Sequence, residues 1–187
     1  RNGGLMINPV GLASKGPRSE VETYYDTIVY FQEHDFEYIY IKNPMYIIKE
    51  DIGDAMEKMK EEDIDCLILS NKTVDMDGEY LNQSIINSDD SGKPTGVGIN
   101  LGITDTVDLF LGSLLMKKEA FLNVLRHAMQ ANVSNTMLSA LFAYPGKLNI
   151  DFYRQEKEFE IIKDVNSFYE VNMRLLDEDI FDDLFYK

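Results

Sequence analysis

Apolar residues recur along this chain in two alternating patterns. Some segments space them three or four positions apart, as on one face of an α-helix, and others hold short β-branched or aromatic runs typical of buried strands. The strand patterns lie at Leu5–Ile7, Phe36–Ile41, Tyr46–Ile48, Cys66–Ser70, Asp105–Met116, Lys147–Arg154 and Glu158–Ile162. The helical patterns lie at Ser19 to Glu33 or His34, Ile52–Glu62, Lys118–Ala131, Asn135–Ala143, Ser167–Leu176 and Asp177–Lys187.

Polar residues mark the starts of three of these helices. Ser19 and Glu22 have the spacing of a capping box, and Asp51 precedes the second helical pattern. Asp164 or Asn166 can cap the helix that begins near Ser167 in the same way.

The order of the elements predicts an α/β fold. The strand–helix–strand unit over residues 36–70 favours parallel pairing of its strands. Turn-forming residues at Asp75–Glu79 and Asn87–Pro94 flank Tyr80–Ile86 and Thr95–Ile103, which predicts a hairpin or a meander. We expect one mixed, mainly parallel sheet flanked by helices, in a single domain over residues 1–187, because no repeat or linker divides the chain.

Charge and composition narrow the function. The 187 residues carry a formal net charge of -15, which repels phosphate backbones and anionic membrane surfaces, so we expect no nucleic-acid and no membrane partner. No stretch reaches the roughly 18 apolar residues that cross a bilayer. The single cysteine, Cys66, lies inside an apolar run and is expected to be a small buried hydrophobe. With no signal-peptide pattern, the chain is expected to be cytoplasmic.

Local motifs do not identify an enzyme. No phosphate-loop pattern and no Ser–His–Asp arrangement can be aligned. Asp75 and Asp77, with Asp89 or Asp90, can supply oxygen ligands to a divalent cation, but turns also recruit aspartate for local hydrogen bonds.

Aromatic residues occur at helical spacing near the end of the chain. Phe168, Tyr169 and Phe185 are expected to belong to the hydrophobic core and not to a ligand-stacking surface.

One segment resembles a known family. Residues 159–176 read FEIIKDVNSFYEVNMRLL, and their helical part, Ser167–Leu176, is similar to the S-[FY]-Y-E-A-N-M-x-L-L helix that ends the catalytic domain of ADP-glucose pyrophosphorylases (glucose-1-phosphate adenylyltransferases). The resemblance covers the other elements in order, but only this helix is specific. It implies a Rossmann-like, GT-A-like nucleotidyltransferase domain that is incomplete, lacking the N-terminal nucleotide loop and the C-terminal β-helix.

The chain departs from that family at the positions that carry chemistry. Asn43-Pro44 stands near the place of one metal-binding aspartate, and Ile161 stands at the place of the second. An isoleucine cannot bind Mg²⁺, the cation of active relatives. The E-K-P sugar-phosphate motif is also missing around Gly98–Thr104. This pattern of loss resembles the GlgD-type, non-catalytic subunit of the enzyme.

The resemblance implies a regulatory role in glycogen biosynthesis, with no catalytic residue, metal or cofactor of its own. Such a subunit forms a hetero-oligomer with the catalytic pyrophosphorylase subunit, which converts ATP and glucose 1-phosphate to ADP-glucose and pyrophosphate. Asn43, Ile161, Lys163 and Asp164 would then line the remnant of the substrate cleft, and Lys163 can hold an anionic sugar phosphate or nucleotide.

Two alternatives stay open. One is a divergent active sugar-phosphate nucleotidyltransferase in which Asp75, Asp77 or Asp164 replaces the missing metal ligands. The other is a non-enzymatic α/β module that binds a partner protein through exposed aromatic residues.

Overall fold

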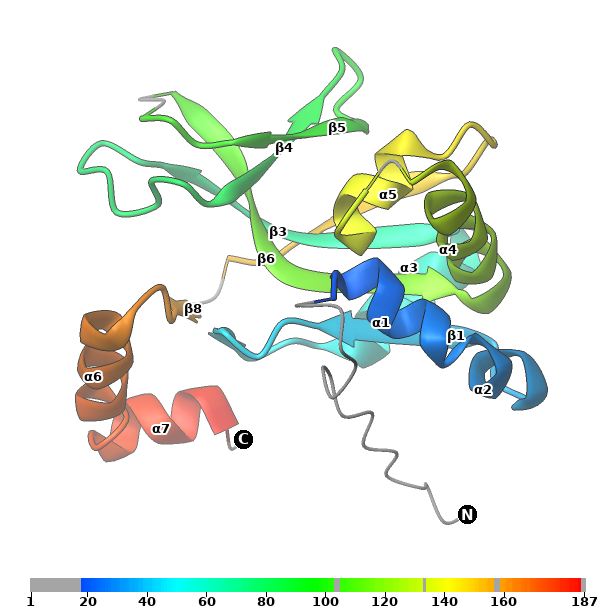
Figure 1. Cartoon of the computed structure of the whole chain (residues 1–187). Helices are drawn as coiled ribbons and strands as arrows, with labels where there is room; N and C mark the ends of the chain where they lie inside the picture. The colour runs from blue at the N-terminus through cyan, green and yellow to red at the C-terminus, as the bar shows by residue number, and fades with distance from the viewer. Residues whose placement is uncertain (1–17, 103–104, 133, 157–158, 186–187) are drawn as a thin grey trace. The chain divides into compact units, whose positions relative to one another are not determined.

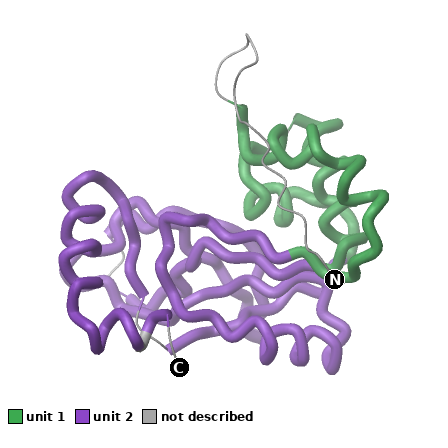
Figure 2. The backbone as a smooth tube through the Cα atoms, turned by 90° about the horizontal axis from the view of Figure 1, so that it is seen from below, with its two compact units in different colours: residues 1–39, 117–147 green, residues 40–116, 148–187 purple. Residues whose placement is uncertain are grey.

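The computed structural model describes residues 18–102, 105–132, 134–156 and 159–185 (Figure 1). The strand predicted at Leu5–Ile7 lies outside these residues. The chain divides into two compact units, residues 1–39 with 117–147 and residues 40–116 with 148–187 (Figure 2). No linker-like sequence marks the boundaries, and the single domain expected from the sequence stays a prediction.

The first unit is helical. Its helices are α1 (Glu20–Asp26), α2 (Ile28–Glu33), α4 (Lys118–Ala131) and α5 (Met137–Ala143). The predicted capping box at the start of α1 is present: the Ser19 hydroxyl accepts a hydrogen bond from the Glu22 amide at 3.2 Å, and the Glu22 carboxylate accepts one from the Ser19 amide at 2.8 Å.

The single helix expected from Ser19 to Glu33 or His34 is instead two helices. Thr27 ends α1 and precedes α2, with backbone angles of φ -107° and ψ 13°. Its hydroxyl donates to the Tyr24 carbonyl at 3.0 Å, so a side chain satisfies an acceptor at the end of α1. Tyr24 and Phe31, on either side of the break, both meet the Phe121 ring edge-on, with centroids 5.9 and 5.1 Å away.

The second unit is built on a mixed sheet with the strand order β5-β4-β6-β3-β7, in which β1 also pairs with β6. The strands are β1 (Tyr38–Lys42), β3 (Cys66–Val74), β4 (Ser84–Ser88), β5 (Pro94–Ile99), β6 (Thr106–Lys117) and β7 (Ile150–Arg154). β3 and β7 are parallel, whereas β3–β6, β4–β6 and β4–β5 are antiparallel. The predicted α/β class, with a mixed sheet and helices, is confirmed, and β4 and β5 form a hairpin as predicted. Of these four pairs only β3–β7 is parallel, although mainly parallel pairing was expected, and the sheet strands before and after α3 in the chain, β1 and β3, each pair with β6.

The core of this unit follows the longest apolar runs of the sequence. Cys66–Ser70 is buried along its whole length in β3, and β6 is buried over most of Val107–Met116. Burial raises the pKa of the Cys66 thiol, as expected for an inert buried cysteine. Helix α3 (Ile52–Glu61) is capped by Asp51, whose carboxylate accepts from the Asp54 amide at 3.2 Å, and it buries Ala55 and Met59.

A bulge interrupts the pairing of β6 with β3. Ile68 is opposite Leu114, but Ser70 is opposite Phe110, so β6 carries extra residues at this point. Gly112 lies within them with φ +75°, a left-handed conformation that glycine adopts without steric cost.

The bulge is where the chain entering β2 meets the sheet. The Gly112 carbonyl accepts a hydrogen bond from the Asn43 amide at 2.8 Å. The Tyr46 ring lies so close that a Cβ atom on Gly112 would fall 2.5 Å from its Cδ2 atom. The Tyr46 hydroxyl donates to the Gln83 side-chain oxygen at 3.0 Å, which fixes the ring in this position.

A two-stranded ribbon and two helices complete the second unit. They are β2 (Tyr46–Ile48), β8 (Phe159–Ile161), α6 (Val165–Arg174) and α7 (Glu178–Phe185). β2 and β8 are antiparallel, with Tyr46 opposite Ile161. None of the helices in the described ranges has the length and apolar character needed to cross a membrane.

The expectation that the aromatic residues of α6 and α7 are core residues is wrong. Phe168, Tyr169 and Phe185 are 54%, 65% and 53% exposed. Within α6 the buried residue is Val171 instead, three positions after the exposed Phe168.

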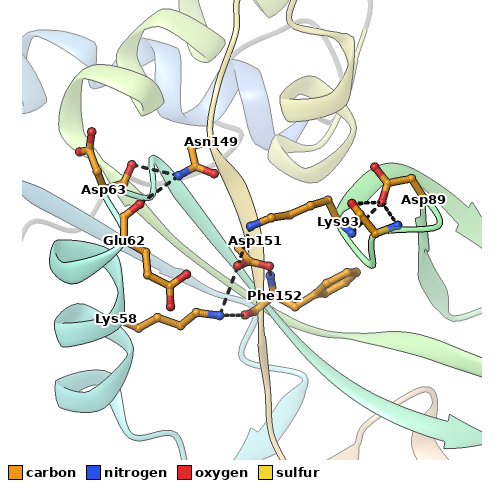
Figure 3. A network of polar contacts seen from close by, with 9 residues as sticks. Lys58, Glu62, Asp63, Asp89, Lys93, Asn149, Asp151 and Phe152 are labelled. Carbon is orange, nitrogen blue, oxygen red and sulfur yellow. Dashed lines mark hydrogen bonds and ion pairs between the residues drawn. The ribbon is translucent and has the colours of Figure 1, made fainter.

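A polar network ties the β4–β5 hairpin to β7 (Figure 3). The Asp151 carboxylate on β7 lies 2.8 Å from the Lys93 ammonium, just before β5, and 3.4 Å from the Lys58 ammonium on α3. Lys58 also donates to the Phe152 carbonyl at 2.8 Å. Since β5 and β7 stand at opposite ends of the strand order, the turn before β5 reaches back to the far edge of the sheet.

Asp151→Asn is expected to lower the free energy of unfolding by about 1 kcal/mol, because it removes the charge that pairs with both lysines. Burial alone would raise the pKa of Asp151, but hydrogen bonds from Lys93 and the Phe152 amide, with the charges of both lysines, hold it below its ordinary value. A carboxylate whose pKa is lower in the folded than in the unfolded state stabilises the folded protein at pH values above its unfolded-state pKa. This stabilisation is lost as the pH falls through its folded-state pKa.

The difference in the free energy of unfolding between wild type and Asp151→Asn, measured in urea, should therefore be largest at pH 7 and should decrease below about pH 4. A difference that grew on acidification would contradict this account.

Candidate functional site

The four residues singled out by the sequence gather around one end of the β2–β8 ribbon. Asn43 precedes β2 and is exposed, and its side-chain oxygen accepts a hydrogen bond from the Met45 amide at 3.0 Å. The Met45 carbonyl in turn accepts from the Ile162 amide at 2.8 Å, just after β8. The ribbon therefore brings the turn at Asn43 next to the segment that leads into α6.

Ile161 points into a hydrophobic cluster. It is 7% exposed and packs with buried residues of four strands, namely Tyr46, Ile48, Leu69, Ile85, Val107, Leu109 and Leu111. The side chains of this cluster carry no carboxylate that could bind a hard cation. The residues at the two metal positions of the resembling family therefore do not fit Mg²⁺: Ile161 has no ligand atom, and the Asn43 oxygen holds a turn.

Lys163 extends from the end of β8 toward the connection between β3 and β4. Its ammonium donates to the Glu79 carbonyl at 2.7 Å, and its backbone amide donates to the Ser167 hydroxyl at 2.8 Å. The lysine thus holds two segments of the second unit together. Its role as an anchor for an anionic ligand stays a prediction.

Lys163 and Ile161 line a small hollow beside α6. The other lining residues are Glu79, Tyr80, Phe159, Glu160, Ser167, Glu170, Val171 and Arg174. The hollow offers about 110 Å³, below the roughly 300 Å³ of typical small-molecule pockets.

The charges around the hollow do not favour a phosphate. Three carboxylates and two cationic side chains line it, and Arg174 forms an ion pair with Glu160. Asn43 and Asp164 are not among the lining residues. Arg174 and Glu160 could not be identified from the sequence, because no local motif links a strand residue to a helix residue fourteen positions later.

Asp164 is the N-cap of α6, as predicted. Its carboxylate accepts from the Ser167 amide at 2.8 Å, and the Ser167 hydroxyl accepts from the Asp164 amide at 2.8 Å. The hydrogen bonds from the Ser167 amide and hydroxyl lower the pKa of Asp164. This carboxylate therefore completes the end of a helix in the way that Ser19 does for α1.

Asp164→Ala is expected to fray the first turn of α6, whereas Asp164→Asn should preserve it, because asparagine caps helices as well as aspartate does. Hydrogen exchange at the Ser167 and Phe168 amides measures the effect. If Asn and Ala increased exchange equally, the negative charge and not the cap would be the important property of Asp164.

The other carboxylates considered as cation ligands also have local roles. Asp75 is buried and accepts hydrogen bonds from the Asn100 side chain at 2.8 Å and the Tyr80 amide at 3.1 Å. Asp89 organises the turn before β5, and hydrogen bonds from Ser91 and Lys93 lower its pKa. Asp77 is exposed. Within the described residues, no group of three or more Asp, Glu, His or Cys side chains is placed to hold a metal ion.

The sequence matches no protein-family model and no curated protein. Its fold, however, is similar to that of solved proteins. HddC from Yersinia pseudotuberculosis matches in two crystal structures, with TM-scores of 0.62 and, in complex with GMP-PN, 0.61. The sequence identities are 10% and 11%, and each match covers 87% of this chain and 64% of HddC.

A putative glucose-1-phosphate thymidylyltransferase from Bacillus anthracis, solved in complex with a sucrose, matches equally well. Its TM-score is 0.62 at 11% identity, over 86% of this chain and 62% of that protein. At these identities the likeness establishes a shared fold, which agrees with the nucleotidyltransferase-like α/β fold expected from the sequence. The chain spans less than two thirds of the length of these proteins.

Proposed function

We propose that this chain is a non-catalytic, GlgD-type subunit of glucose-1-phosphate adenylyltransferase, acting in bacterial glycogen biosynthesis in the cytoplasm. The fold shared with a putative glucose-1-phosphate thymidylyltransferase supports the nucleotidyltransferase part of the proposal. The helix Ser167–Leu176, which carries the resemblance to ADP-glucose pyrophosphorylases, supports the narrower family.

The position of Ile161 is the observation that carries the non-catalytic part. Phosphoryl transfer with Mg²⁺ needs carboxylate ligands that neutralise charge on the phosphates. Ile161 instead belongs to the cluster that joins the ribbon to the main sheet. Of the three candidates to replace it, Asp164 caps a helix, Asp75 is buried and hydrogen-bonded to Asn100, and Asp77 is exposed. The divergent-enzyme alternative therefore gains no support from these side chains.

The proposed role is to modify the activity of a catalytic pyrophosphorylase subunit within a hetero-oligomer. The chain would use its nucleotidyltransferase-like fold to match the shape of the partner, with a sugar phosphate or nucleotide as the effector.

The test compares three enzyme preparations: the full chain alone, the catalytic subunit alone, and the two mixed. ADP-glucose formation from ATP and glucose 1-phosphate with Mg²⁺ is measured in each. We expect no product from the full chain alone and a changed kcat/KM or effector response in the mixture. Steady turnover by the chain alone would show that it is an enzyme, and a mixture identical to the catalytic subunit would show that it is not its regulator.

A further inference from the structure

Helix α6 exposes a continuous apolar stripe. Val165, Phe168, Tyr169, Met173 and Leu176 are each about half exposed or more, with Val165 at 82% and Leu176 at 73%. They are spaced by three, one, four and three residues, which places them on one face of the helix and the turn that follows it. Val171, which is 4% exposed, lies beside this stripe, three positions after Phe168.

Helix α7 also exposes apolar side chains. Phe181 and Phe185 are 37% and 53% exposed, and their rings lie 4.9 Å apart. In Figure 1, α6 and α7 form a helical pair that follows β8. The α6–α7 surface is defined here as these seven side chains, namely Val165, Phe168, Tyr169, Met173, Leu176, Phe181 and Phe185.

An isolated exposed apolar residue is ordinary, but a stripe of five along one helix marks an interaction site. The composition fits a protein partner, because aromatic residues and methionine are enriched in interfaces. Four of the seven residues are aromatic, and another is Met173.

The charges around the surface indicate what kind of partner fits. Asp177, Glu178, Asp179 and Asp182 are exposed beside it on the turn after α6 and on α7. Arg174 is the basic residue of α6, and it forms an ion pair with Glu160 on β8. The rim is therefore acidic, and a matching partner presents an apolar patch edged by lysine or arginine.

A second copy of this chain does not meet that requirement. Two copies docked through the same surface would place their acidic rims against each other, and each chain carries a formal net charge of -15. Like charges brought together across an interface disfavour the pairing.

We propose, building on the function proposed above, that the α6–α7 surface is where this subunit docks onto the catalytic pyrophosphorylase subunit, through an apolar patch on that subunit edged by basic residues. Phe168 and Tyr169 are the central anchors, because they are large, adjacent and exposed. The helix that carries the family resemblance is then also the docking element.

The test is the affinity of the full chain for the catalytic subunit, measured by calorimetry at two salt concentrations. Phe168→Asp and Tyr169→Asp should each weaken binding by about tenfold or more, since truncating interface anchors commonly costs that much. Higher salt should weaken binding of the wild type, because it screens the acidic rim. Val29→Asp is the matched control: Val29 is 55% exposed on α2, in the first unit, which holds none of the seven surface residues, and its change should leave the affinity unaltered.

The outcomes separate this docking site from the proposed function. If the wild type binds and both aspartate variants bind equally well, the proposed docking site is wrong and the proposed subunit role stands. If the wild type does not bind the catalytic subunit, the docking site and the proposed subunit role are both wrong. If light scattering shows that the chain alone is a dimer and that Phe168→Asp makes it a monomer, the occupant is a second copy and the proposal is overturned. Circular dichroism and thermal unfolding should match the wild type in every variant, because the changed side chains are at least half exposed.

Discussion

Ile161→Asp is expected to lower the free energy of unfolding by about 3 to 5 kcal/mol, because it removes a core side chain and buries a carboxylate without a partner. The change restores the residue type that the resemblance places at this position in active enzymes. The physical cost nevertheless dominates, since the side chain points into an apolar cluster of the second unit. Urea unfolding at pH 7 measures the loss, and no ADP-glucose synthesis is expected from the variant.

Ile161→Val is the control for this substitution. It keeps an apolar side chain and removes one methylene, so it should cost only about 1 kcal/mol. A second readout is the change in unfolding stability when Mg²⁺ is added up to millimolar concentrations. If Mg²⁺ stabilised Ile161→Asp and not the wild type or Ile161→Val, position 161 would face a metal site, and its placement in the core would be refuted.

Gly112→Ala is expected to be the other severe change, with a loss of about 2 to 5 kcal/mol from left-handed strain together with overpacking. Gly112 has φ +75°, and a Cβ atom there would meet the Tyr46 ring at 2.5 Å. The ring cannot move freely, because Tyr46 is buried and its hydroxyl is hydrogen-bonded to Gln83. Thermal and urea unfolding report the effect.

Gly92→Ala separates the two causes. Gly92 has φ +81°, but nothing lies within 4 Å of the Cβ atom that would be added, so only backbone strain of about 1 to 2 kcal/mol is expected. The difference between the two alanine variants measures the clash with Tyr46. Equal losses would mean that the ring adapts and that the bulge does not depend on close packing.

Features that depend on neighbouring residues could be predicted from the sequence. The caps at Ser19, Asp51 and Asp164 each depend on a hydrogen bond to a residue three positions later, and all three are present. The β4–β5 hairpin follows from its turn residues in the same way. These signals are local, so no tertiary contact has to be known.

Features that depend on distant residues could not be predicted. The bulge at Gly112 arises from register with β3, and the contact of Lys163 with Glu79 joins segments 84 residues apart. Helix periodicity indicated correctly that α6 has an apolar face but not which face packs. Val171 is buried whereas Phe168, three positions earlier, is exposed, because the spacing of hydrophobic residues alone cannot distinguish a position that packs within the chain from one left exposed.

The candidate site shows the same division. The sequence indicated that Ile161 cannot bind a metal, which needs only the chemistry of its side chain. Its neighbours, among them Tyr46, Leu69 and Leu111, could not be predicted, because they come from strands whose path through the fold the sequence does not reveal.

The ion pairs of Asp151 also bear on the solubility of the protein. Strand β7 is the last in the sheet order, and an edge strand offers unpaired backbone groups to which another chain can add a strand. Lys93 reaches this edge from the hairpin and places a charged side chain beside Asp151. A charge held at the edge opposes strand-to-strand association between molecules. The Lys93–Asp151 ion pair, which joins the hairpin to β7, is therefore also expected to oppose aggregation when the protein is concentrated.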